Sequence, residues 1–266
     1  MPKIIDTADN VTKKLDALKA EGVHTVIRYD DRLPSRAWKQ IFLAEAKAFK
    51  DKGMRLGIVY EGAGATPSSF SEQSGYLDAV YSRQQAAQRG QPDNSAVYFA
   101  VDFDPSESQI QGRILPYFNG VYRAFSEDNN LPKLRVGAYC SGLCATMLKK
   151  EHPDILIWIT CSLGFAGSRG YVRAGKQDLF QNKCDTSLLG VDCDFDEANT
   201  ADWGSFVPWG ESPSPTVPSP PAPINHDIKW LQAVLQKYGY SGQIDGSAGP
   251  LTIAAMIRYA EHFEVS

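Results

Sequence analysis

The strongest constraint on the fold is a series of eight short apolar runs, each of which ends in a polar or aromatic residue. Several runs are continuously apolar and do not alternate with polar residues, which is typical of strands buried on both faces beneath helices. They lie at residues 4–6, 23–28, 55–60, 95–101, 134–140, 155–161, 178–181 and 190–193. We therefore expect eight strands of a buried parallel sheet.

Segments with helical periodicity separate these runs. Residues 11–21 and 38–52 each carry one apolar face, and they end at Gly22 and Gly53, as helices commonly do. Further helical segments lie at residues 71–89 and 106–127. Strand and helix alternating in this way predict an α/β fold, specifically a (β/α)8 TIM-type barrel, in preference to an open doubly wound sheet.

The composition changes sharply at residues 209–223, where proline and serine dominate. Such a run builds neither helix nor sheet and is expected to be an extended spacer. We therefore predict a barrel domain at 1–208, a Pro-rich linker at 209–224 and a small C-terminal helical domain at 225–266.

Candidate functional residues follow from the predicted barrel, because the C-terminal ends of its strands meet at one rim. The run at 96–101 continues into Asp102 and Asp104, whose alternate spacing predicts carboxylates on one side of the chain. Glycoside cleavage needs one carboxyl as a proton donor and another as a base or nucleophile. The predicted catalytic residues are Asp102, Asp104, Glu61 and Asp6, and the predicted substrate-binding residues are Arg28, Tyr60, Tyr139, Trp158, Gln181 and Asp192.

Several of these residues also have a purely structural interpretation. Asp6 can cap the turn into the first helix, and Asp104 can be a turn residue before Pro105. Asp192 belongs to an acidic run that can be a solvated surface. Arg28 is expected to pair with a rim carboxylate, and the aromatic residues can pack instead of stacking on sugar rings.

The positions of histidine and cysteine argue against several other chemistries. The four histidines, at 24, 152, 226 and 262, lie away from the predicted rim, whereas zinc amidases, Ser/His/Asp hydrolases and Cys/His peptidases need imidazole at the site. The five cysteines lack paired CxxC spacing, so we expect no metal cluster and no cofactor. Cys184 and Cys193 could form a disulfide in an oxidising compartment, although the sequence does not settle the pairing.

Charge and hydropathy limit the partners. The formal net charge is −4 and no basic arm is present, so nucleic acid is not an expected partner. No segment reaches the roughly 18 uninterrupted apolar residues of a membrane span, and no Sec signal peptide is visible. Acidic strand ends could still hold magnesium or calcium, so a metal-dependent phosphodiesterase stays open as an alternative.

Several ordered motifs carry a resemblance to a known family. The segments RLGIVYE (55–61), YFAVDFD (98–104) and RVGAYC (135–140), with the opening at Ile5, Asp6 and Thr7, resemble the glycoside-hydrolase-like family called domain of unknown function 1906. Its barrel is similar to that of family 25 lysozymes. This resemblance covers roughly residues 3–206 and implies a barrel with a carboxylate site.

The lysozyme comparison also implies roles for individual residues. Asp6, Asp102 and Asp192 match by position the aspartates of the first strand, of the Asp-x-Glu pair and of the chain end. The place of the acidic Glu is held here by Asp104, whose side chain is one methylene shorter and would misplace a proton donor. Glu61, on the neighbouring strand, is then the alternative acid.

Residues 225–266 resemble a peptidoglycan-binding domain 1-like module, through an amphipathic segment around Trp230, a Gly-Tyr turn, an Asp-Gly loop and a Gly-Pro-x-Thr segment. A tethered wall-binding module would raise the effective concentration of the barrel on the polymer. Together the two resemblances imply a muramidase-like hydrolase of the peptidoglycan glycan, or alternatively a non-catalytic peptidoglycan-binding protein. We expect action at the cell wall or in the periplasm, after export by a specialised secretion or lysis route.

Overall fold

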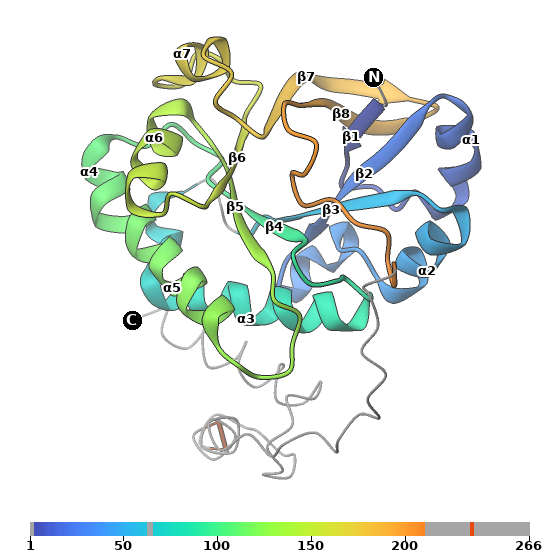
Figure 1. Ribbon diagram of the computed structural model, residues 1–266, viewed down its shortest axis with the longest axis horizontal. Coiled ribbons are helices and arrows are strands. Elements are labelled where there is room, and N and C mark those ends of the chain that lie inside the picture. The colour runs from blue at the N-terminus through green and yellow to red at the C-terminus, as the bar shows by residue number, and fades with distance from the viewer. Residues whose placement is uncertain (1–2, 63–65, 211–234, 237–266) are drawn as a thin grey trace. The chain divides into compact units, whose positions relative to one another are not determined.

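The structure is a computed structural model that describes residues 3–62, 66–210 and 235–236. Eight strands, β1 to β8, form a closed barrel in which neighbours in space follow the order of the sequence (Figure 1). The strands are β1 Lys3–Asp6, β2 Val23–Asp30, β3 Arg55–Tyr60, β4 Ala96–Ala100, β5 Arg135–Cys140, β6 Leu156–Ile159, β7 Leu179–Leu188 and β8 Val191–Ala198. All eight predicted apolar runs overlap a strand.

The last strand overturns the predicted (β/α)8 TIM-type barrel. Strands β1 to β7 pair in parallel, whereas β8 is antiparallel to both β7 and β1. Only Leu189 and Gly190 connect β7 to β8, both with positive φ (55° and 70°), and a parallel crossover would need a dozen or more residues. The fold is therefore a closed barrel of mixed strand direction that ends in a hairpin.

The predicted small C-terminal helical domain is not part of the structure described. Apart from Leu235 and Gln236, residues 225–266 lie outside the described residues. The same holds for most of the predicted Pro-rich linker at 209–224.

Helices cover the outside of strands β1 to β6 (Figure 1). They are α1 Leu15–Ala20, α2 Leu43–Lys52, α3 Glu72–Gln88, α4 Glu107–Gln109, α5 Leu115–Ser126, α6 Gly142–Glu151 and α7 Ser168–Arg173; 3₁₀ turns lie at Thr12–Lys14, Pro34–Lys39 and Pro67–Ser69, and a π-helical turn lies at Ile110–Ile114. Helices α3 and α5 approach closely at two glycines. A Cβ on Gly75 would lie 2.0 Å from Tyr117 O, and one on Gly120 would lie 2.0 Å from Glu72 O.

The barrel interior is packed with side chains. One apolar cluster fills the layer between the strands and the helices, and a second fills the barrel itself, including Ile4, Ile27, Tyr98, Trp158 and Trp203. The Tyr98 hydroxyl donates to Trp203 O (2.7 Å), and a Cβ on Gly57 would lie 2.9 Å from the Trp203 ring. The interior is thus a solid core, and the polar groups gather at the C-terminal ends of the parallel strands.

Candidate active site at the barrel mouth

Asp6, at the end of β1, is a deeply buried acid at the barrel mouth, with 2% of its surface exposed. It lies opposite Asp194 in the antiparallel β1–β8 ladder, so both side chains point to the same face of the sheet. Its two carboxylate oxygens accept hydrogen bonds from the Tyr29 hydroxyl (3.0 Å) and from Gln181 Nε2 (2.9 Å). Strands β1, β2, β7 and β8 therefore all contribute to this end of the site.

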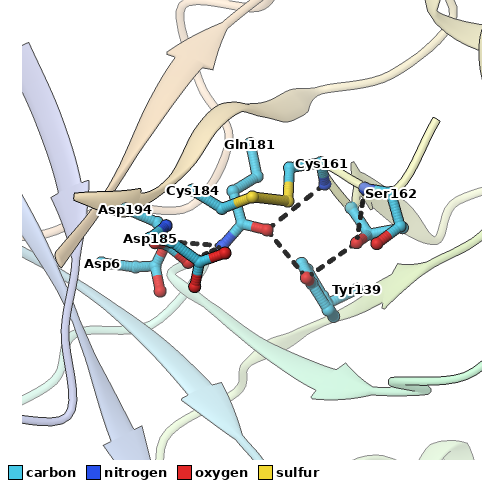
Figure 2. The surroundings of a disulfide bond; sticks show 9 residues. Asp6, Tyr139, Cys161, Ser162, Gln181, Cys184, Asp185 and Asp194 are labelled. Atoms are coloured by element: carbon cyan, nitrogen blue, oxygen red, sulfur yellow. Dashed lines mark hydrogen bonds between the residues drawn. A yellow bond between two sulfur atoms is a disulfide. The ribbon is translucent and has the colours of Figure 1, made fainter.

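Gln181 connects the acids to the opposite wall of the mouth (Figure 2). Its Nε2 donates to Asp6 and also to Asp194 Oδ2 (2.8 Å). Its Oε1 accepts from the Tyr139 hydroxyl (2.8 Å) and from the Cys161 backbone N–H (3.3 Å). Because amide oxygen and nitrogen each face only complementary groups, this network fixes the orientation of the amide.

Burial and a neighbouring like charge make Asp6 harder to ionise. Desolvation first and then the charge of Asp194 raise the pKa of Asp6 from 3.8 to about 7, although the bonds from Gln181 and Tyr29 oppose the shift. Asp196 lies two residues beyond Asp194 on β8 and is 7% exposed. Burial first and then the charge of Asp6 raise the pKa of Asp196 well above its usual value.

Asp196 has no hydrogen bond of good geometry to either oxygen within the described part of the chain. It is nevertheless close enough to Asp6 and to Trp158 for hydrogen bonding with them to influence its pKa. Asp196 is therefore a buried carboxyl without a strong partner among the described residues. This end of the mouth therefore holds three acids, Asp6, Asp194 and Asp196, and burial raises the pKa of each of them.

Lys39 supplies the positive charge of the mouth. It belongs to the 3₁₀ turn after β2, and its Nζ lies 3.0 Å from Glu61 Oε2 and 2.7 Å from Glu61 O. The ammonium also lies 5.4 Å from the centre of the Tyr29 ring, which is within range of a cation–π contact. It joins Glu61, which follows β3, to the Tyr29–Asp6 side of the site.

Asp102, which follows β4, completes the rim. The residue is exposed, yet its carboxyl is partly desolvated, and this desolvation raises its pKa while the charge of Lys39 lowers it. Burial also raises the pKa of Tyr139 well above its usual value, with smaller contributions from the charges of Asp102 and Asp6. Asp102 thus lies within electrostatic reach of both walls of the mouth.

Five of the predicted site residues come together at this mouth: Asp6, Glu61, Asp102, Tyr139 and Gln181. Asp104 is bound to a loop backbone. It is exposed and its Oδ1 accepts from Ala166 N (2.9 Å), in the loop after β6. Asp192 is also exposed, because it opens an antiparallel strand and does not end a parallel one.

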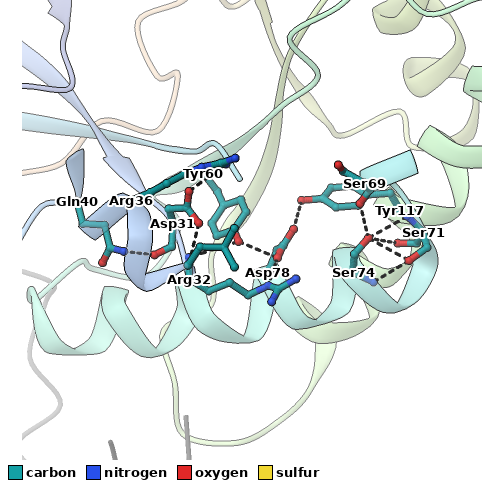
Figure 3. Close-up of polar contacts among 11 residues, drawn as sticks. Asp31, Arg32, Arg36, Gln40, Tyr60, Ser69, Ser71, Ser74, Asp78 and Tyr117 are labelled. Atoms are coloured by element: carbon teal, nitrogen blue, oxygen red, sulfur yellow. Dashed lines mark hydrogen bonds and ion pairs between the residues drawn. The ribbon is translucent and has the colours of Figure 1, made fainter. Parts of the chain in front are cut away.

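The other three predicted residues lie in packed surroundings. Arg28 is fully buried and forms its ion pair with Glu45 of α2 (3.0 Å), so its partner is not a rim carboxylate. Trp158 is 1% exposed within the barrel core, where its ring packs edge-on against Tyr139. Tyr60 points to the helix layer and donates to Asp78 Oδ1 of α3 (2.7 Å) (Figure 3).

Tyr29, Lys39, Asp194 and Asp196 are functional candidates that the sequence interpretation did not select. Asp192, Asp194 and Asp196 alternate at the period of a strand, and this was the available signal. The predicted barrel makes the final strand parallel, which places its last residue at the rim and leaves Asp194 and Asp196 unselected. In the hairpin the direction is reversed, so the residue beside Asp6 is Asp194.

A disulfide joins Cys161, in the loop after β6, to Cys184 in β7 (Figure 2). The suggested Cys184–Cys193 pair is therefore wrong, and Cys193 is a buried free thiol. In the antiparallel ladder Cys193 lies opposite Thr186. Cys140, at the end of β5, is also a buried free thiol whose pKa burial raises well above the usual value, which disfavours a nucleophilic thiolate.

Other features of the described residues bear on alternative functions. No three His, Cys, Asp or Glu side chains among them are arranged so that they could hold a metal ion. None of the helices in this part of the chain is both long and apolar enough to cross a membrane. A cavity of about 940 Å³ is lined by residues at the strand starts, among them Lys3, His24 and Arg55, and it is also lined by Asp196.

Comparison with known proteins gives one family and several relatives. A family model described as "Rv2525c-like, glycoside hydrolase-like domain" matches residues 16–198. The Bacillus subtilis (strain 168) protein YbfG is 31% identical over 176 residues, which are 62% of this chain and 24% of YbfG. FadG of the same organism is 25% identical over 169 residues, which are 62% of this chain and 29% of FadG. The chain thus spans less than a third of the length of each of these relatives.

Among solved structures, the Tat-secreted protein Rv2525c of Mycobacterium tuberculosis, in complex with HEPES, is similar to this chain. The TM-score is 0.64 at 22% identity, and the match covers 79% of this chain and 99% of that one. At this level of identity the likeness concerns the fold alone.

Proposed function

The chain belongs to the Rv2525c-like family of glycoside hydrolase-like domains, and from that premise we propose that it hydrolyses the glycan of peptidoglycan in a muramidase-like reaction. The observation that carries the proposal is the convergence of Asp6, Glu61 and Asp102 with Lys39 and two tyrosines at one end of the barrel. Paired carboxyls in different surroundings are the arrangement that glycoside cleavage requires.

In the proposed mechanism Asp102 and Glu61 have different tasks. Asp102 faces solvent and its pKa is raised by desolvation, so it suits the proton donor to the departing sugar oxygen. Glu61 accepts a hydrogen bond from Lys39 and suits the carboxylate that assists water or attacks the sugar carbon. Asp6 is buried behind Tyr29 and acts as a positioning residue.

The wall polymer as substrate is supported by the segment at 225–266, which lies outside the described residues apart from 235–236. This segment resembles a peptidoglycan-binding module, and such a module would hold the barrel on the wall. The Cys161–Cys184 disulfide suits an exported protein, since such bonds persist in oxidising compartments. Rv2525c, which shares the fold, is Tat-secreted.

A second candidate function is binding of the glycan without cleavage. It is favoured by one observation, namely that Asp104, in the place of the family 25 acid, is bound to the Ala166 backbone. The barrel would then hold sugar at the mouth and lack a competent acid in that position.

Purified sacculi separate the two functions. The full chain should release new reducing ends, and Asp102→Asn should lower the rate by roughly 10²- to 10⁴-fold, the usual contribution of an acid–base group. Asp104→Asn is the matched control and should keep most of the activity, since Asp104 is bound outside the cluster. Sedimentation with sacculi and no release of reducing ends from the native chain would support binding alone.

A further inference from the structure

The disulfide adjoins two backbone groups that bind the acid cluster. Cys161 itself donates its N–H to Gln181 Oε1 (3.3 Å). Asp185, the residue after Cys184, donates its N–H to Asp194 Oδ1 (2.8 Å). Each end of the cross-link is therefore within one residue of a donor to the site (Figure 2).

Through Gln181 the first of these donors reaches both acids. The Cys161 N–H and the Tyr139 hydroxyl hold the amide oxygen, and this directs the amide nitrogen toward Asp6 and Asp194. If the amide rotated, its oxygen would face two carboxyls, which also accept hydrogen bonds. The position of Cys161 thus helps to determine how Asp6 and Asp194 are bound.

The second donor lies in an irregular part of β7. The pairing of β7 with β8 shifts register between Gln181 and Lys183 and again between Lys183 and Thr186. Within this bulge Asp185 has φ of 54°, a left-handed conformation that is uncommon for residues other than glycine. Bulges of this kind turn a backbone or side-chain group toward a site and need surrounding structure to keep their shape.

We propose that the Cys161–Cys184 disulfide is a positioning element of the site, which holds the Cys161 and Asp185 N–H groups against Gln181 and Asp194. The bond links the loop after β6 to the bulge of β7, so neither donor can move away independently of the other. An effect of the disulfide on catalysis rests on the proposed function. Its effect on the hydrogen bonds of Asp6 and Asp194 is independent of that function.

The direction of the effect follows from the chemistry of the donors. A hydrogen bond donated to a carboxylate stabilises its charged form. The Gln181 amide lowers the pKa of Asp6, and the Asp185 N–H lowers that of Asp194. Release of the two donors should therefore raise both pKa values.

The test is an NMR titration of the Asp6 and Asp194 carboxyl carbons in the full chain, before and after reduction. A dithiol reductant transfers two electrons and two protons to the disulfide, which gives two thiols while the reductant closes to its own cyclic disulfide. We expect the pKa of each carboxyl to rise by on the order of one unit, the equivalent of one hydrogen bond to a charged group. The double variant Cys161→Ser/Cys184→Ser should reproduce the values of the reduced chain and should not respond to the reductant.

Cys144→Ala is the matched control, because it removes a buried cysteine from α6 and leaves the disulfide intact. Its titration should coincide with that of the native chain. Identical titrations of the oxidised and reduced chains would overturn the proposal. If reduction unfolds the chain, Gln181→Leu with the disulfide intact should still raise the pKa of Asp6, and the lack of that rise would overturn it too.

The titration needs no substrate, so its outcome is separate from that of the proposed function. A chain that does not cleave sacculi can still show the shift on reduction. Conversely, cleavage together with unchanged titrations would leave the hydrolase standing and remove only the role of the disulfide.

Discussion

Two buried aspartates with tyrosine partners lie on either side of the barrel wall, and they differ in the charge that surrounds them. Asp78 of α3 accepts from the Tyr60 and Tyr117 hydroxyls (2.7 and 2.9 Å) and forms an ion pair with Arg32 (2.6 Å) (Figure 3). Asp6 also accepts from a tyrosine, but its charged neighbours are the acids Asp194 and Asp196. Within the described residues no ion pair reaches Asp6.

The comparison shows that burial alone does not identify a functional acid. A carboxylate with a cation and two donors is a stable part of the framework, because its charge is compensated where it is buried. A buried carboxyl among other acids has a raised pKa and is costly to ionise. The distinction lies in the charges that surround each carboxyl, and stability measurements on variants of the chain should test it.

The largest effect is expected at the compensated site. Asp78→Asn removes the charge that Arg32 and the two tyrosines bind, and it should lower the free energy of unfolding by about 3–5 kcal/mol, as for other broken buried pairs. Asp6→Asn should leave stability at pH 7 unchanged or slightly higher, since it removes a charge beside Asp194. Urea unfolding of the two variants measures both, and equal losses would contradict the comparison.

The second-largest loss of stability is expected when the Cys161–Cys184 disulfide is removed. Its two cysteines are 23 residues apart in the sequence. Cys161→Ser/Cys184→Ser should lower the free energy of unfolding by about 3 kcal/mol, from the loop entropy that the unfolded chain regains. Guanidinium unfolding gives the value, with Cys144→Ala as reference. A loss no larger than that of the reference would show that the β7–β8 hairpin holds the mouth without this bond.

Loss of a tyrosine donor should change the free energy of unfolding by a smaller amount, and this amount should differ between Asp78 and Asp6. Tyr60→Phe removes a hydrogen bond to an ion-paired carboxylate and should cost about 2 kcal/mol of unfolding free energy. Tyr29→Phe removes a bond to Asp6, which is partly protonated at pH 7, and should cost less at that pH while raising the pKa of Asp6. Thermal unfolding at pH 7 compares them, and a greater loss for Tyr29→Phe would reverse the assignment.

The smallest effect is the change in the free energy of unfolding per pH unit that the titration of Asp6 causes. Its folded pKa of about 7 exceeds the unfolded value of 3.8, so the folded state binds the proton more tightly. The resulting stability is complete below about pH 4 and is lost as the pH rises through 7, with a slope of at most about 1.4 kcal/mol per pH unit. Denaturation from pH 4 to 8 should show this slope in the native chain and a weaker slope in Asp6→Asn; parallel curves would refute it.

The sequence predicted the strands well, because continuous apolar runs bounded by turns are a local signal. Arg55–Tyr60 was predicted to the residue, and the run at 190–193 marks the start of β8. Strand direction was not predictable in the same way, since it depends on the two-residue turn at Leu189 and Gly190. That one error moved the candidate acid from Asp194 to Asp192.

The candidate site was predicted in part for a similar reason. Asp6 and Asp102 were found because they follow apolar runs directly, as was Gln181 from its place near a strand end. Lys39 lies in the 3₁₀ turn Pro34–Lys39, beyond the end of β2 at Asp30, so no strand end marks it in the sequence. The choice of Glu45 as the partner of Arg28 depends on how α2 packs. Local sequence spacing therefore predicts neither the Lys39–Glu61 ion pair nor the Arg28–Glu45 ion pair.

The closing position of β8 between β7 and β1 has a consequence for biosynthesis. Asp6 and Gln181 are 175 positions apart, and Asp194 is encoded later still. While the ribosome makes the intervening chain, β1 has an unpaired edge of the kind that can join a foreign strand. The acids stay separated throughout elongation, so their mutual repulsion first arises after most of the apolar core is available to offset it.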